Sequence, residues 1–297
     1  MVMNRKFIQI VIINIFTIML VCLVCKYLLL FCSYRNIEKD LEAAFRDTNE
    51  FFFCLNYETY YQRHNFVPPV LNESKNGKKP IVILGCSFAE GSGLSNEEKF
   101  SNRLHDVTKR DVYNRAMFGQ GLQYMLYQLE DENFYKELPE PEYVIYVYMW
   151  DQIRRLYKEC APWMKSPFYE EKENGELKKI ENPFYYMFPM VCVRYFQDFN
   201  DNEKTYSLLR KHFIYAKELA DKHWKNAKWI LLIYDEYSPI EQFEELKKYG
   251  YTIAPAKDLV PSDFYTNLKY RLSAKDVHPS KEAWLLLTPK FVKKYIK

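Results

Sequence analysis

Residues 80–93 read PIVILGCSFAEGSG, and this stretch decides the fold class. Ile81, Val82, Ile83 and Leu84 form a short continuous apolar run, which is typical of a strand buried on both faces of a parallel sheet. The run ends at a glycine, and small residues follow it. We therefore expect a buried strand that turns sharply into a helix, with Ser87 on the turn.

The rest of residues 80–297 alternates between two kinds of pattern. Three further short apolar runs predict strands, at 112–113, 143–148 and 229–234. Helical spacing of apolar residues predicts helices at 97–106, 122–129, 206–224, 240–249 and 281–296, the last interrupted near Pro289. Strands that alternate with helices predict an α/β fold with a mostly parallel sheet.

Residues 156–202 break this alternation and are interpreted as an insertion. Asn174-Gly175 between two short apolar runs predicts a β-hairpin with a type I′ turn. An aromatic segment follows at 184–188. The insertion is either a lid over the site or an extra packing layer on the core, and the sequence favours neither.

The N-terminal segment predicts a membrane anchor. Residues 7–25 contain no charge over 19 positions, nearly enough helix to span a bilayer, and no cleavage site follows. A cleaved signal peptide and a buried soluble helix are the alternatives. The predicted organisation is a cytoplasmic tip and transmembrane helix at 1–33, a stalk helix and linker at 34–79, and a catalytic domain at 80–297. Basic residues before the span favour a cytoplasmic N-terminus and a catalytic domain outside the cytoplasm.

Composition excludes several classes of function. The net charge is +3 and no long basic run occurs, so nucleic-acid binding has no support. The seven cysteines show no metal-binding pattern, although one disulfide among Cys54, Cys160 and Cys192 is an open alternative. No metal and no organic cofactor is expected.

The carboxyl ends of parallel strands are where ligands bind, so Ser87 lies in the expected place. A serine in a Gly-rich turn is by itself most often a turn residue, and its hydroxyl needs a base to act as a nucleophile. His278, just before the terminal helix, follows Asp276 by two residues, so the carboxylate can orient the imidazole. The other four histidines, at 64, 105, 212 and 223, are interpreted as surface or packing residues.

These segments, in order, resemble the blocks of the SGNH (GDSL-like) hydrolases, and the stretch as far as residue 100 resembles their membrane-associated branch. Gly85-Cys86-Ser87 is similar to the first block, with Cys in place of Asp. Gly119 stands at the position of the second block. Asp151 stands where the third block usually has an Asn. Asp276 and His278 are similar to the last block, with a spacing of two rather than the usual three.

The resemblance implies a three-layer α/β/α sandwich with a five-stranded parallel sheet, of which the fifth strand is not evident from the sequence. It also implies a Ser87–His278–Asp276 triad and an oxyanion hole from the Ser87 and Gly119 N–H groups. At the third oxyanion position an ionised Asp151 accepts hydrogen bonds and cannot stabilise an oxyanion. Three alternatives stay open there: a protonated Asp151, donation by Gln152, or reliance on two backbone groups.

The expected function is a serine esterase that acts on an ester, such as an O-acyl group, of an envelope glycan or lipid. An O-acyltransferase would use the same triad and is the first alternative. A degenerate, non-catalytic glycan-binding protein is the second.

Overall fold

The computed structural model describes residues 77–157, 166–181, 202–274 and 276–296. The chain divides into two compact units, Met1–Tyr57 and Glu58–Lys297, and every described residue belongs to the second. The predicted anchor, nearly all of the predicted stalk and linker, the aromatic segment and the three scattered cysteines lie outside the described residues. Within the described part of the chain, no helix is both long enough and apolar enough to cross a membrane.

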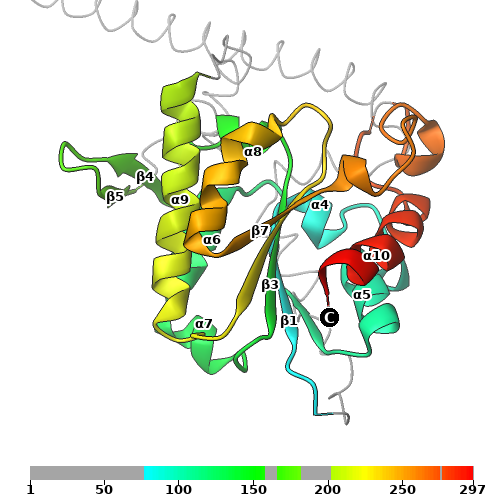
Figure 1. The fold of residues 1–297 in the computed structure, drawn as a ribbon, viewed down its shortest axis with the longest axis horizontal. Coiled ribbons are helices and arrows are strands. Elements are labelled where there is room, and N and C mark those ends of the chain that lie inside the picture. Colours follow the sequence, from blue (N-terminus) through cyan, green and yellow to red (C-terminus); the bar gives the residue numbers. More distant parts are fainter. Residues whose placement is uncertain (1–76, 158–165, 182–201, 275, 297) are drawn as a thin grey trace, which may run out of the picture. The chain divides into compact units, whose positions relative to one another are not determined.

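A five-stranded parallel sheet forms the centre of this unit (Figure 1), as expected. Its strand order is β2-β1-β3-β6-β7, and every neighbouring pair is parallel. The strands are β1 (Ile81–Gly85), β2 (Val112–Asn114), β3 (Tyr143–Tyr148), β6 (Lys228–Ile233) and β7 (Tyr251–Pro255). All residues of β1 and β3 are buried, which explains their unbroken apolar character.

Helices cover both faces of the sheet, so the predicted three-layer arrangement is confirmed (Figure 1). One face packs against α4 (Ser87–Glu90), α5 (Phe100–Thr108) and α10 (Lys281–Tyr295). The other face packs against α6 (Leu122–Leu129), α7 (Glu132–Lys136), α8 (Asp151–Arg154), α9 (Glu203–Asp221) and the 3₁₀ helix η4 (Ile240–Tyr249). The predicted helix at 97–106 is two pieces, η1 (Asn96–Glu98) and α5, because Lys99 between them has extended backbone.

The terminal helix α10 differs from the prediction, because it continues through Pro289. A proline inside a helix removes one N–H and leaves the carbonyl four residues earlier without its helical partner. That carbonyl belongs to Leu285, which is 48% exposed on the outer side of the helix. Solvent can satisfy it there, and this reduces the cost of the missing hydrogen bond.

The predicted hairpin is confirmed as β4 (Phe168–Glu171) and β5 (Leu177–Ile180), but its turn is not type I′. A type I′ turn needs positive φ at two central residues, whereas only Gly175 has it, at 83°. The N–H of Gly175 donates to Lys172 O at 2.9 Å, and the N–H of Lys172 donates to Glu176 O at 2.8 Å. This pattern is a type I turn closed by a glycine bulge.

The hairpin lies beside α9 (Figure 1) and packs on the helices of that face. Phe168 and Tyr169 are 1% exposed, and Lys179 forms an ion pair of 2.9 Å with Glu130. Lys211 of α9 forms another with Glu171. For the hairpin itself, these contacts favour the packing layer over the lid.

Candidate active site

A constrained glycine sets up the turn that carries Ser87. Gly85 ends β1 with φ of 143°, and a Cβ there would lie 2.8 Å from Val147 O. Any side chain at this position would therefore collide with the backbone of β3. The chain then enters α4 at Ser87, which is buried, with 4% of its surface exposed. The sharp turn thus fixes Ser87 at the carboxyl end of the sheet, as the sequence predicted.

Ser87, His278 and Asp276 are brought together as a continuous hydrogen-bonded chain. His278 Nε2 lies 2.7 Å from Ser87 Oγ, and His278 Nδ1 lies 2.6 Å from Asp276 Oδ1. An ionised carboxylate only accepts, so the hydrogen-bond pattern assigns the Nδ1 proton to the Asp276 bond. Nε2 then accepts from the serine hydroxyl, which is the arrangement that a general base requires.

The spacing of two between acid and base has a local explanation. Asp276 Oδ1 accepts from the backbone N–H of His278 at 2.9 Å as well as from its ring. The N–H of Asp276 in turn bonds to Ser273 Oγ at 3.0 Å. One carboxylate therefore holds both the turn and the imidazole, and a second intervening residue is not needed.

Further contacts fix the position of the loop that carries His278. The N–H of Leu272 donates to the carbonyl of His278 at 3.0 Å, and Ser280 Oγ donates to Lys269 O at 2.7 Å. The ring of Phe88, next to the serine, lies 4.8 Å from the imidazole ring. The base is thus held from the loop side and from the α4 side.

Gly119 lies in the loop that follows β2, and this loop is tied to the serine turn. The N–H of Met117 donates to Gly85 O at 3.1 Å, and the side chain of Asn114 donates to Ala89 O at 2.8 Å. Gly119 itself has φ of 69°, in the left-handed region that favours glycine. The structure therefore links the loop of Gly119 to both ends of the turn that carries Ser87.

Asp151 is an acceptor in this structure. Arg155 Nε and Nη2 lie 2.9 and 2.7 Å from Asp151 Oδ2, which is a two-pronged guanidinium–carboxylate contact. Arg155 Nη1 also donates to Gln120 O at 2.6 Å, so the pair connects α8 to the loop of Gly119. The arrangement gives Asp151 a structural partner and offers no donor from its side chain.

Gln152 does not replace the missing donor. It is fully buried, and its Nε2 lies 3.1 Å from both Cys86 Sγ and Val147 O. Its Oε1 accepts from the hydroxyl of Tyr146. The amide is therefore committed to the core beneath the serine turn, and the alternative that assigned it to the oxyanion is wrong.

Sequence reasoning missed Asp235, which follows the end of β6. Its Oδ2 accepts from the N–H of Trp150 at 2.6 Å, and its Oδ1 accepts from the N–H of Tyr237 and of Ser238 at 2.9 and 2.8 Å. Burial raises the pKa of this carboxyl above its ordinary value, against the lowering effect of these hydrogen bonds. The signal that could have identified Asp235 in the sequence is its position directly after a predicted strand. Asp235 positions the chain immediately before Asp151.

The other described histidines serve packing, as expected. Burial in α9 lowers the pKa of His212 to about 4, and its Nδ1 lies 2.8 Å from Leu208 O. His223 stacks on Tyr135 with ring centres 3.8 Å apart, and His105 Nδ1 bonds to Arg110 O at 2.8 Å. His278 differs from all three in lying beside a serine hydroxyl.

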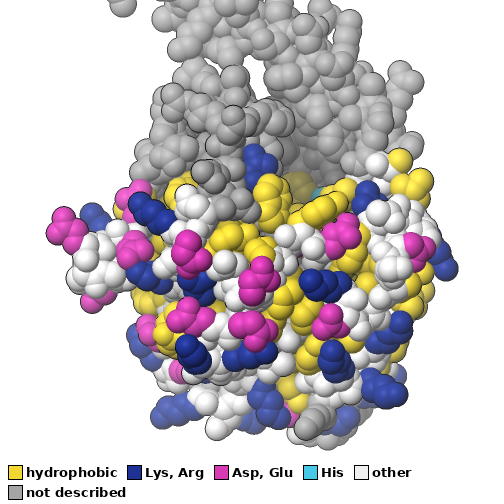
Figure 2. Space-filling model, turned by 45° about the horizontal axis from the view of Figure 1, so that its top comes forward, with side chains coloured by type: hydrophobic (Ala, Val, Ile, Leu, Met, Phe, Trp, Pro, Cys, Tyr) yellow, Lys and Arg dark blue, Asp and Glu magenta, His cyan; other side chains and the backbone are white. Residues whose placement is uncertain are grey.

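Two other features of the described residues bear on function. They contain no group of His, Cys, Asp and Glu side chains arranged to hold a metal ion. On the face seen in Figure 2, basic and acidic side chains alternate, with no broad patch of one sign. That face is not the kind of surface that binds a nucleic-acid backbone.

No family model and no curated protein matches this chain by sequence. Among solved structures, it is similar to a lipolytic protein of the G-D-S-L family from Desulfitobacterium hafniense, with 16% identity, TM-score 0.44, and coverage of 73% of this chain and 99% of that one. A G-D-S-L family member from Veillonella parvula is similar at 13% identity, TM-score 0.45, 73% and 98% coverage. An acetyl xylan esterase from Butyrivibrio proteoclasticus is similar at 11% identity, TM-score 0.44, 72% and 63% coverage. Similarity at this level assigns no activity.

Proposed function

We propose that this chain is a serine esterase of the SGNH type, with Ser87 as nucleophile, His278 as general base and Asp276 as the group that orients His278. The observation that carries the proposal is the hydrogen-bonded chain from Ser87 Oγ through His278 to Asp276, with links of 2.7 and 2.6 Å. A serine hydroxyl is a weak nucleophile unless a base takes its proton, and this geometry supplies the base. Ser87 and His278 are 191 residues apart in the sequence, so local turn formation does not explain their meeting.

The reaction proceeds through an acyl-enzyme. His278 takes the proton of Ser87 Oγ as that oxygen bonds to the ester carbon, and the imidazolium then gives the proton to the departing alcohol. Water next attacks the acyl carbon, and His278 takes a proton from that water; the bond between the acyl carbon and Ser87 Oγ breaks, and His278 gives the proton to Ser87 Oγ. The oxyanion of each tetrahedral intermediate lies against the N–H groups of Ser87 and Gly119. With Asp151 bound to Arg155, these two backbone donors are the oxyanion hole.

The substrate that we propose is an O-acyl ester of an envelope glycan or lipid. Support for an amphiphilic substrate comes from exposed apolar residues near the triad. Val277, between the acid and the base, is 50% exposed, and Leu268, on the pocket beside the loop of His278, is 57% exposed. The proposed setting is a single-pass membrane protein with its N-terminus inside and its catalytic domain outside the cytoplasm. A periplasmic or extracellular reporter fused after Lys297 tests this orientation, and activity of a cytoplasmic reporter would contradict it.

An O-acyltransferase is the second candidate, because it would use the same triad to pass the acyl group to an alcohol instead of to water. The third is a glycan-binding protein that does no chemistry. Added glycan accelerates turnover only in a transferase, and Ser87→Ala leaves function intact only in a binding protein.

Labelling with a fluorophosphonate tests the proposed triad directly. The full chain in detergent is treated with the probe, and the adduct is located by mass spectrometry. We expect an adduct on Ser87 that disappears in His278→Ala and persists in the matched variant His223→Ala. Ser207→Ala removes a half-buried hydroxyl from α9 and is the control for loss of a serine; the adduct on Ser87 should persist in it. A correctly folded chain that gives no adduct would mean that the site is degenerate.

A further inference from the structure

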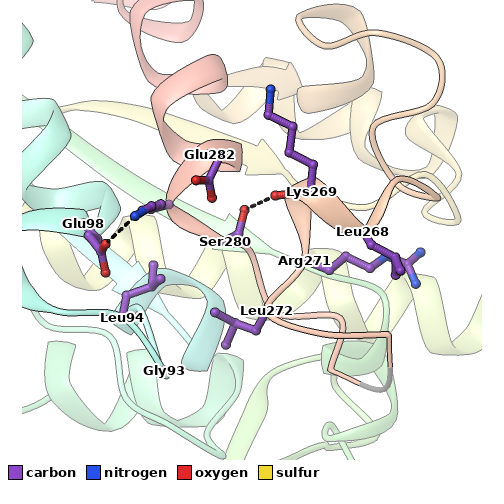
Figure 3. Close-up of a pocket in the computed structure, with 10 residues that line it drawn as sticks. Gly93, Leu94, Glu98, Leu268, Lys269, Arg271, Leu272, Ser280 and Glu282 are labelled. Carbon is purple, nitrogen blue, oxygen red and sulfur yellow. Dashed lines mark hydrogen bonds and ion pairs between the residues drawn. The ribbon is translucent and has the colours of Figure 1, made fainter. Parts of the chain in front are cut away.

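A pocket of about 460 Å³ lies beside the loop that carries His278 (Figure 3). Leu94, which follows the turn of Ser87 along the chain, forms one side of it. Leu272, whose backbone N–H donates to the carbonyl of His278 at 3.0 Å, forms another, and Figure 3 shows the two leucine side chains pointing toward each other. The pocket is therefore bounded by segments attached to the base and to the nucleophile, and not by the loop of Gly119.

This location matters because the two sides of Ser87 receive different parts of an ester. The carbonyl oxygen turns toward the N–H groups of Ser87 and Gly119. The alcohol oxygen must instead lie within reach of His278 Nε2, since the imidazolium gives that oxygen a proton as it departs. Of the two sides, the pocket adjoins the loop of His278, on which the alcohol portion depends for its proton.

The lining of the pocket is polar as well as apolar. Glu98 and Lys281 line it as an ion pair of 3.5 Å, and Glu282 adds a second carboxylate from the first turn of α10. Figure 3 shows the Lys269 and Arg271 side chains pointing away from the two leucines. An aliphatic acyl chain in this space would remove water from these carboxylates without replacing its hydrogen bonds. The lining suits a molecule that carries hydroxyl groups.

Glu282 is the residue best placed to recognise such hydroxyls. Its side chain is half-buried, and no described residue makes a hydrogen bond or an ion pair with it. In Figure 3 its carboxylate lies between Glu98 and Ser280. A carboxylate accepts from several hydroxyls at once, while the leucines offer contact to the C–H face of a sugar ring.

We infer that this pocket binds the polyhydroxylated, sugar-like alcohol portion of the ester, with Glu282 as its specificity-determining acceptor. The inference rests on the proposed esterase activity and deepens it. In the acyl-transfer direction, His278 takes the proton of a sugar hydroxyl as that oxygen bonds to the acyl carbon. The bond between the acyl carbon and Ser87 Oγ then breaks, and the proton passes from His278 to Ser87 Oγ.

The test compares two acetyl esters on the full chain in detergent: 4-nitrophenyl acetate, and methyl glucoside acetylated at one hydroxyl. The measured quantity is the ratio of kcat/KM for the sugar ester to kcat/KM for the nitrophenyl ester. We expect Glu282→Ala to lower this ratio about tenfold or more, because a charged acceptor for the sugar hydroxyls is lost. Glu282→Gln, which keeps the size of the side chain, lowers it less and serves if the alanine variant folds poorly. Glu244→Ala on η4 is the matched control and leaves the ratio unchanged.

A second measurement follows transfer of the acetyl group to a sugar and does not require the alanine variant. With 4-nitrophenyl acetate as donor and free methyl glucoside as acceptor, the wild-type chain should form acetylated methyl glucoside, and Glu282→Gln should shift the acetyl group toward water. Turnover of the nitrophenyl ester with no transfer, or with an unchanged ratio in both Glu282 variants, would overturn the sugar pocket and leave the esterase standing. A folded chain that turns over neither ester would instead overturn the proposed function itself.

Discussion

The two sides of Ser87 differ in how they are built. On the side of α5 and α10, the base and the acid already form the short hydrogen bonds of proton transfer. On the side of α6 and α8, the expected amide donor is replaced by Asp151, whose carboxylate is held by Arg155. In the proposed mechanism, proton transfer therefore depends on side chains, whereas charge stabilisation depends on backbone N–H groups. The two tasks are thus separable within one site, and each can be perturbed alone.

The largest effect is expected from the proton-transfer side. Asp276→Asn keeps the shape of the acid but favours the wrong tautomer of His278, because an amide N–H facing Nδ1 makes Nδ1 the acceptor. We expect kcat for 4-nitrophenyl acetate to fall by ~10³–10⁴. Asp106→Asn, on the surface of α5, is the matched control. A loss of less than tenfold would show that the Asp276–His278 bond does not control the reaction.

The buried His212 gives the α9 side of the sheet a stability that depends on pH. Burial lowers its pKa from 6.5 to about 4 in the folded chain, so between these values the unfolded chain binds more protons. The free energy of unfolding therefore falls as the pH drops from 6.5 toward 4, by roughly 3 kcal/mol from this group.

Urea unfolding at several pH values checks this assignment. His212→Met removes the ionisable group with little change in volume, and we expect its stability to depend less on pH in the window between 6.5 and 4. His105→Gln, at the end of α5, should keep the wild-type slope. If His212→Met keeps that slope as well, another group is responsible for the loss of stability in acid.

A substitution of Arg155 tests how far the loop of Gly119 depends on the contacts of Arg155 with Asp151 and Gln120. Arg155→Lys keeps the positive charge, but a single ammonium cannot bridge Asp151 and Gln120 O in the way that the guanidinium does. The loop of Gly119 should loosen, and we expect kcat to fall roughly tenfold with a smaller change in KM. Arg210→Lys, which breaks a comparable set of contacts on α9, is the control. Unchanged kcat in Arg155→Lys would mean that the loop holds its geometry unaided.

Much of this fold could be predicted because its strands are buried on both faces. The unbroken apolar runs of β1 and β3 left little ambiguity, and the strand 143–148 matches the observed bounds. The fifth strand, β7, was not predicted because it is an edge strand. Thr252 is exposed to solvent, and the strand ends at Pro255. Its pairing with β6 is decided by tertiary contact and not by a strong local pattern.

For the site, the sequence predicted which residues meet but not what supports them. Ser87, Asp276 and His278 stand in recognisable positions next to predicted strand and helix ends. The roles of Gln152 and Asp235 depend on hydrogen bonds across the sheet, to Cys86 and to Trp150, which no local pattern encodes. The bond from Arg155 to Gln120 likewise joins residues far apart in the sequence.

Asp151 offers the finest test of the contrast between the two sides, because one substitution adds a donor and weakens a support. Asp151→Asn gives the site an amide N–H where the acid has none, yet it removes the charge that Arg155 grips. An oxyanion donor is typically worth ~10²–10³ in rate when well aligned, and the loosened loop offsets much of that gain. We expect a net rise in kcat of only about threefold. Asp151→Ala separates the two contributions, because it removes the contact with Arg155 without adding a donor. The ratio of kcat in Asp151→Asn to kcat in Asp151→Ala then measures the effect of the amide alone. A ratio near one would show that side chain 151 does not reach the oxyanion, and that the two backbone groups act without it.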